Sequence, residues 1–242
     1  MNINTPLFII LSFLLTRVSQ AQPFITKGTI TFERKVQMHK ILEDNEWVKA
    51  NMASIPKFYL STFQLHFNED TLLYHKVGED EPNSASWAIF ARENEVVTIF
   101  STGQSVVKKT VYNDDFMIKD SLPKYRWKLV NETRKIAGVE CKKATTIIND
   151  SVFVVAFYAE TILVSGGPEQ FCGLPGMILG VIVPRLHVSY YAQKMEREEK
   201  QQFSLPKHKG KTMKRKEFQE MVLKNMKWAF SNSAIGALYL FL

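Results

Sequence analysis

Few side chains in this sequence have the type and spacing that enzymatic chemistry needs. Ser165 stands beside the glycines Gly166 and Gly167. As a nucleophile it would need a base and an orienting acid, for which His187 and Asp150 are the candidates. One serine beside two glycines lacks the strand, turn and helix context of a nucleophile elbow. The sequence also contains no zinc-protease or phosphate-loop motif. We therefore expect a protein that is not an enzyme, has no catalytic residue and binds no cofactor.

His66 and His75 are the candidate metal ligands. Residues 58–67 and 71–77 alternate in a way that predicts a hairpin turning at Glu69 and Asp70. In that register the two histidines are diagonal neighbours on one face, about 7–8 Å apart between backbones. A metal would need a third ligand from elsewhere in the chain. Two solvated surface histidines explain the pattern equally well, so we predict no metal site.

Cys141 and Cys172 are the only cysteines, too few and too far apart for a zinc site. In an exported protein an even number of cysteines favours a disulfide. That bond would close a loop of about 30 residues and add roughly 2–4 kcal/mol to stability. Two buried free thiols are the alternative.

The first 21 residues have the pattern of a signal peptide. Residues 6–15 form an apolar run that is too short to span a bilayer, which takes about 20 residues. Ser19 and Ala21 then supply the small residues that precede a cleavage site. Because no basic residue precedes the run, an N-terminal membrane anchor is the alternative. We expect cleavage after Ala21 and one exported domain over residues 22–242.

Positive charge is concentrated near the end of the chain. The formal net charge is +7, and residues 193–228 carry 11 lysines and arginines against 5 glutamates. In an exported protein this charge favours an anionic membrane surface or an acidic partner over nucleic acid. A solvated loop and helix face, residues 203–228, is the blander alternative. The candidate contacts to an anionic partner are Lys207, Lys209, Lys211, Lys214, Arg215 and Lys216.

Most of the chain alternates apolar and polar residues as short antiparallel strands do. Residues 151–158 are apolar on both faces, which places them at the centre of the sheet. Residues 177–183 form another apolar strand, residues 212–228 carry a helical apolar stripe, and residues 234–242 suit a closing strand. The predicted fold class is mainly β (α+β): a large curved antiparallel sheet or half-open barrel with a C-terminal helix packed on it.

A glycine- and proline-bound turn precedes the strand at residues 177–183. Its residues are Gly173, Leu174, Pro175, Gly176, Met177 and Ile178. Pro175 fixes φ and Gly176 can adopt the positive φ of a type II turn. The run resembles the signature of the bacterial GLPGLI family, with Met177 in place of leucine, and the resemblance extends over residues 127–183. It implies an exported protein of a Gram-negative bacterium, periplasmic, with secretion or outer-membrane association as alternatives.

Three functions are compatible with these features. The preferred one is a non-enzymatic binding or carrier protein whose apolar strands line a cavity for a hydrophobic ligand. The first alternative is a protein–protein interaction module of a cell-envelope assembly that uses an exposed strand edge. A hydrolase is the last alternative. The expected partner is accordingly a hydrophobic ligand or an envelope protein.

Overall fold

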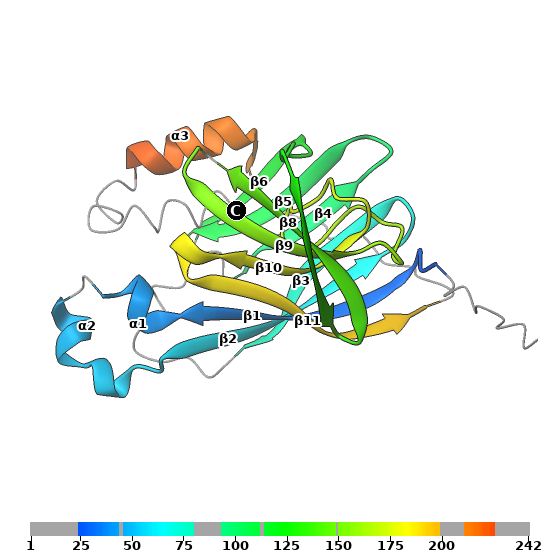
Figure 1. Ribbon diagram of the computed structural model, residues 1–242. Helices are drawn as coiled ribbons and strands as arrows, with labels where there is room; N and C mark the ends of the chain where they lie inside the picture. Colours follow the sequence, from blue (N-terminus) through cyan, green and yellow to red (C-terminus); the bar gives the residue numbers. More distant parts are fainter. Residues whose placement is uncertain are drawn as a thin grey trace, which may run out of the picture.

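The computed structural model of the protein (Figure 1) describes residues 24–43, 46–79, 93–111, 114–148, 150–198 and 211–225. The predicted signal peptide, most of the basic loop and the predicted closing strand at residues 234–242 lie outside these ranges. Within them, no helix is long and apolar enough to cross a membrane.

The described residues form one mixed sheet of twelve strands with short helices at its ends. The strands are β1 (Gly28–Gln37), β2 (Phe58–Phe67), β3 (Thr71–Glu79), β4 (Glu95–Ile99), β5 (Gln104–Val111), β6 (Asp114–Ser121), β7 (Lys128–Ile136), β8 (Val139–Ile148), β9 (Val152–Ala159), β10 (Met177–Val183), β11 (Val188–Arg197) and β12 (Lys211–Met213). The helices are α1 (Met38–Ile41), α2 (Glu46–Ala50) and α3 (Arg215–Asn225), with 3-10 turns at Met52–Ser54 and Pro184–Leu186.

The strand order is β12-β6-β5-β4-β3-β2-β1-β11-β10-β9-β8-β7. All neighbours are antiparallel except the parallel pair β12 and β6. The sheet is open, strongly curved and carries α3 near one end, so the predicted fold class is confirmed (Figure 1). The prediction that residues 151–158 form its centre is wrong, because β9 lies third from the β7 edge. On the face of β9 that β7 crosses, the Arg134 guanidinium lies 5.7 Å from the Phe157 ring centroid, whereas Phe153 is 46% exposed.

The hairpin of β2 and β3 has the predicted register, with Phe67 opposite Leu72 and Leu65 opposite Tyr74. Its apolar residues face the same side as Phe32 of β1, and the Tyr74 ring stacks on Phe63 at 4.8 Å between centroids. We call this side of the sheet the inner face. Because strand side chains alternate, it also carries Arg34, Lys109 and Tyr190.

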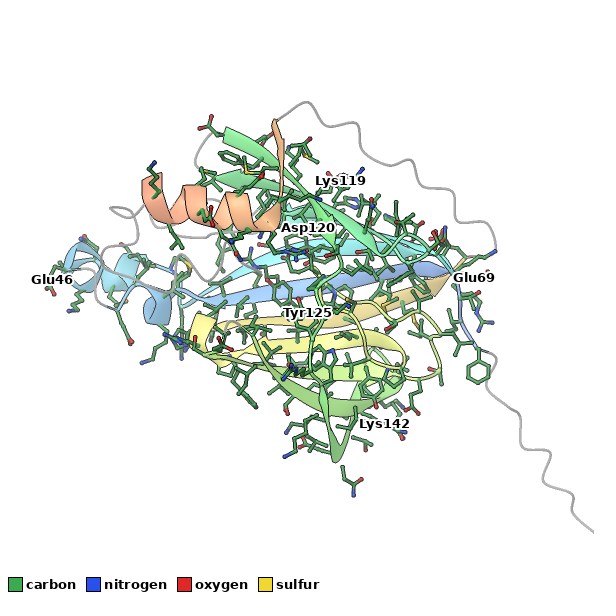
Figure 2. The ribbon with its side chains drawn as sticks, turned by 90° about the horizontal axis from the view of Figure 1, so that it is seen from above. Glu46, Glu69, Lys119, Asp120, Tyr125 and Lys142 are labelled. Carbon is green, nitrogen blue, oxygen red and sulfur yellow. The ribbon has the colours of Figure 1, made fainter. Side chains whose placement is uncertain are left out.

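Helix α3 covers the inner face over β6. Phe218 is buried and its ring contacts Phe116 edge to face, at 5.6 Å between centroids. The helix begins where the Arg215 backbone N–H donates to the Asp120 carboxylate, at 3.0 Å. The Glu217 carboxylate accepts from the N–H of Lys214, the residue before the helix, at 3.0 Å, as in a capping box. Figure 2 shows Asp120 at this end of α3.

β8 pairs with β9 in the sheet, and its hairpin partner β7 crosses the strands β9 to β11 on the other face (Figure 1). The crossing point is Gly180 of β10, which pairs with Phe157 on one side and Tyr191 on the other. A Cβ at position 180 would lie 2.9 Å from Ile136 Cδ1 and 3.0 Å from Tyr191 Cε1. The absent side chain therefore lets the hairpin approach the sheet.

Replacing Gly180 with alanine should destabilise the protein by about 1–3 kcal/mol, because the added methyl overpacks this crossing. Gly78→Ala is the matched control, since its Cβ would meet only Thr62 Cβ, at 3.8 Å. The free energy of unfolding of each variant, from urea denaturation, checks the prediction. Equal stabilities for the two variants would show that the crossing does not depend on Gly180.

Candidate functional site

The long connection between β9 and β10, residues 160–176, folds onto the inner face. The motif residues at its end make a turn that differs from the expected type II geometry. Gly176 has φ +144°, and its N–H donates to the Leu174 carbonyl at 2.8 Å, so the turn spans three residues around Pro175. The Gly176 backbone lies against the Ala159 carbonyl and leaves no room for a side chain. Leu174, Met177 and Ile178 are buried, so the motif aims β10 into the core.

Ser165 lies in the same connection and stabilises its turn by hydrogen bonds. Its hydroxyl donates to the Leu174 carbonyl at 2.7 Å and accepts from the Gly173 N–H at 3.1 Å. Trp127, which directly precedes β7, reinforces the turn, because its indole N–H donates to the Cys172 carbonyl at 2.8 Å. The Ser165 hydroxyl is therefore committed to loop structure, and no hydrogen bond joins it to His187 or Asp150 in the described segments.

Glu169, in the middle of the connection, is the most unusual residue that the structure reveals. It has φ +54°, a left-handed conformation that side chains other than glycine disfavour, and only 2% of it is exposed. One carboxylate oxygen accepts from the Asn94 amide at 2.8 Å, and the other accepts from the Tyr190 hydroxyl at 3.4 Å.

Two buried cations and a second tyrosine surround this carboxylate. Arg34 is opposite Tyr190 in the strand register, and its guanidinium carbon lies 5.9 Å from the Tyr190 ring centroid. Burial, opposed by the charge of Glu169, lowers the pKa of Lys109 to about 8. Burial and the charge of Glu169 both raise the pKa of Tyr74 well above its usual value. We call these residues the Glu169 cluster: Arg34, Tyr74, Asn94, Lys109, Glu169 and Tyr190.

The Glu169 cluster is closed to solvent, since each of its six residues is buried. A buried carboxylate is costly unless charges and hydrogen bonds compensate it, and this one has both. The arrangement therefore fastens the connection to the inner face. Sequence reasoning missed the cluster because its members come from strands and connections far apart in the chain. One signal was available: Arg34 interrupts the apolar alternation of Ile30, Phe32 and Val36.

An open groove of about 850 Å³ lies where the tip of the β7–β8 hairpin meets the ends of β9 and β11. We call it the hairpin groove. It is lined by Ile25, Thr133, Arg134, Lys135, Gly138, Val139, Glu140, Lys142, Glu160, Thr161 and Arg197. The Lys142 ammonium donates to the Glu160 carboxylate at 2.8 Å, which joins β8 to the end of β9. Figure 2 shows Lys142 far from α3.

The walls of the hairpin groove are fixed by backbone bonds as well. The Ile25 N–H donates to the Thr161 carbonyl at 2.9 Å, and the Leu163 N–H donates to the Ile25 carbonyl at 3.0 Å. The hydrogen bond to Glu160 raises the pKa of Lys142, so this lysine stays cationic at neutral pH. The groove thus offers ammonium and guanidinium donors, carboxylate acceptors and threonine hydroxyls from a rigid frame.

The predicted disulfide is not formed, and both cysteines are free and buried. The Cys141 thiol contacts the Val139 carbonyl at 3.5 Å, within its own hairpin. The Cys172 thiol contacts the Pro123 carbonyl at 3.6 Å, beside the connection. Burial raises the pKa of each thiol to about 11. The two side chains have separate partners, as the alternative of two buried thiols requires.

Part of the predicted basic segment stabilises the fold through hydrogen bonds. Arg215 donates to the Gln170 side chain at 2.9 Å and to the Ser121 carbonyl at 3.2 Å, so it ties α3 to the connection. The Lys216 ammonium lies 3.8 Å from Glu220 on α3, and Lys214 lines a small cavity of about 260 Å³. Lys207 and Lys209 lie outside the described residues, as does the Lys211 side chain.

His66 and His75 lie side by side, as the hairpin register predicts. Their rings stack at 5.3 Å between centroids, and the Thr29 hydroxyl lies 2.9 Å from His66 Nδ1. Among the described residues no third metal-binding side chain joins them.

Solved structures with the same kind of sheet identify the class of fold. Two structures of PNGF-II, in the C2 and P21 space groups, match with TM-scores of 0.50 and 0.51 and sequence identities of 16% and 17%. Each match covers 82% of this chain and 33% of the solved chain. This chain therefore spans about a third of the length of the proteins it resembles, and the likeness establishes the fold alone.

The sequence itself establishes the family. Residues 80–219 match the profile of the family described as N-glycanase peptide, N-terminal domain. The chain belongs to this family of N-terminal domains of N-glycanases. A search of curated protein sequences found no match.

The family match overturns two predictions. The resemblance to the GLPGLI family is wrong, because the matched segment contains the whole signature and belongs to a different family. A turn of glycine and proline that aims a buried strand meets a local backbone requirement, so it is a poor family marker. The predicted binding or carrier protein for a hydrophobic ligand is wrong as well, because the chain belongs to a family of N-glycanase N-terminal domains. The connection that carries Phe171 also packs onto the inner face, so it covers apolar strand residues there.

The free energy of unfolding of the wild type, measured relative to that of the Lys109→Met variant, should increase as the pH rises from about 8 to about 10. The pKa of Lys109 is lowered from 10.5 to about 8 on folding, so in this window the unfolded chain binds more protons. Under linkage, stability then rises with pH. Urea denaturation of both proteins at pH 7.5 and pH 10 measures the difference. Lys108→Met, from the solvent-facing side of β5, should show no comparable change; a wild-type advantage that is equal at both pH values would contradict the prediction.

Proposed function

We propose that this chain is a glycan-binding domain that acts in glycoprotein deglycosylation, and that it holds an oligosaccharide in the hairpin groove. The observation that carries the proposal is the groove itself, open, preorganised and lined by hydrogen-bonding side chains. Membership of a family of N-glycanase N-terminal domains supplies the ligand class, since an N-glycanase acts on N-glycans.

The chemistry of the hairpin groove suits a sugar. A saccharide has many hydroxyl groups that both donate and accept, so its site needs donors and acceptors side by side. Lys142 and Glu160 provide one of each across a 2.8 Å contact, and Thr133 and Thr161 can do both. The volume of about 850 Å³ is within the range of small-ligand sites, roughly 300–1,000 Å³.

The frame of the hairpin groove is held by bonds within the protein. Binding costs less when the side chains and loops of a site are already ordered. Here the N-terminal segment, the end of β9 and the hairpin are linked by the backbone bonds of Ile25 and by the ion pair of Lys142 with Glu160.

The proposal assigns binding rather than hydrolysis to this chain. Hydrolysis by paired carboxylates needs both groups beside the scissile bond. Glu169 is buried against its own partners and cannot reach a substrate in this conformation. The carboxylates of the groove are Glu140 and Glu160, and Glu160 is paired with Lys142, which fits a group that positions a ligand.

The double variant Lys142→Ala with Glu160→Ala should bind a neutral N-glycan on an asparagine peptide about tenfold more weakly than the wild type. It removes both charges of the exposed pair, so it leaves no unpaired partner behind. Lys143→Ala with Glu132→Ala is the matched control: this pair, at 2.6 Å, lies on the same hairpin and does not line the groove. Isothermal titration calorimetry measures the affinities.

Absence of binding by the wild type, or equal losses in the two double variants, would overturn the proposed site. Mass spectrometry of the same mixtures tests the assignment of binding alone. Release of the glycan by the wild-type chain would contradict it.

A further inference from the structure

The hairpin groove carries more positive than negative charge. Its cations are Arg134, Lys135, Lys142 and Arg197, and its anions are Glu140 and Glu160. Lys142 and Glu160 neutralise one another. Of the remaining groups, Arg134 and Lys135 share the single carboxylate of Glu140, so a neutral ligand would leave positive charge in the site uncompensated.

Arg134 is held against two aromatic rings of the sheet. Its Nη1 donates to the Tyr191 hydroxyl at 3.0 Å. Its guanidinium carbon lies 4.9 Å from the Tyr191 ring centroid and 5.7 Å from that of Phe157, as in cation–π contacts. An arginine held in this way has lost its rotamer freedom before a ligand arrives. A guanidinium has five N–H donors, of which the hydrogen bond to Tyr191 uses one, so a planar donor edge remains for the ligand.

The position of Arg134 follows from the fold. Tyr191 and Phe157 flank Gly180 on the neighbouring strands, and Gly180 is where the hairpin comes close to the sheet. The same packing that admits Ile136 over Gly180 sets Arg134, two residues earlier on β7, over the two rings. The arginine is therefore placed by the architecture and not by a mobile loop.

We infer that the hairpin groove binds glycans that carry an acidic substituent, a carboxylate or a sulfate ester, and that Arg134 is the anchor for that anion. The inference rests on the proposed glycan-binding function and adds its ligand class. A guanidinium edge matches the two oxygens of a carboxylate or sulfate with parallel hydrogen bonds, which an ammonium cannot do. Thr133 and Lys135 supply further donors beside it.

The test compares one N-glycan peptide in three forms: neutral, with terminal sialic acid carboxylates, and with sulfate esters. Calorimetry on the full chain should give an affinity about tenfold higher for at least one acidic form, and higher salt should reduce that advantage. Arg134→Lys keeps the charge and loses the planar edge, so it should remove most of the advantage of the acidic form over the neutral form. The acidic form that binds more tightly than the neutral form shows whether the anion is a carboxylate or a sulfate ester.

Arg134→Gln and Lys108→Gln form a charge-matched pair, because Lys108 lies on β5 and pairs with Asp115 outside the groove. Only Arg134→Gln should lose the preference for acidic glycans. Equal affinities for neutral and acidic forms would overturn the inference and leave the proposed function standing. Binding of no form would overturn both. An acidic preference that survives in Arg134→Lys and Arg134→Gln would overturn the role of Arg134.

Discussion

The buried carboxylate of Glu169 is the interaction on which the rest of this structure depends. Removing a carboxylate from water costs several kcal/mol unless charges and hydrogen bonds replace the lost hydration. Its left-handed backbone costs about 1–2 kcal/mol more. Asn94 and Tyr190 supply the hydrogen bonds, and Arg34 and Lys109 supply the positive charge. Together they fix the connection between β9 and β10 on the inner face.

Fixing this connection also determines the structure on the opposite face of the sheet. Because the connection is fixed, the turn at its end has one position, where Gly176 lies against the Ala159 backbone. The position of this turn determines where β10 begins. Three residues into β10, Gly180 opens the space that the β7–β8 hairpin fills. The hairpin in turn carries Arg134 and Lys142 to the hairpin groove. A buried ionic cluster on one face thus places an open polar site on the other.

The parts of the fold that depend on local pattern could be predicted from the sequence. Alternation and turn residues gave the β2–β3 register, the span of β10 and the proximity of His66 and His75. The Glu169 cluster and the hairpin groove could not be predicted, because they join residues from strands that only the strand order brings together. Local pattern also misled in two places. β9 is apolar on both faces without being central, since β7 covers Phe157 and leaves Phe153 exposed, and a short turn motif suggested the wrong family.

The most direct test of this account is an NMR titration of the isotopically labelled chain with an N-glycan peptide. The account predicts chemical-shift changes at the amides that line the hairpin groove, among them Arg134, Lys142 and Thr161. It predicts none at the Glu169 cluster, which the connection closes. Shift changes centred on Asn94, Glu169 and Tyr190, with none in the groove, would show that the inner face is the binding site and would contradict the account.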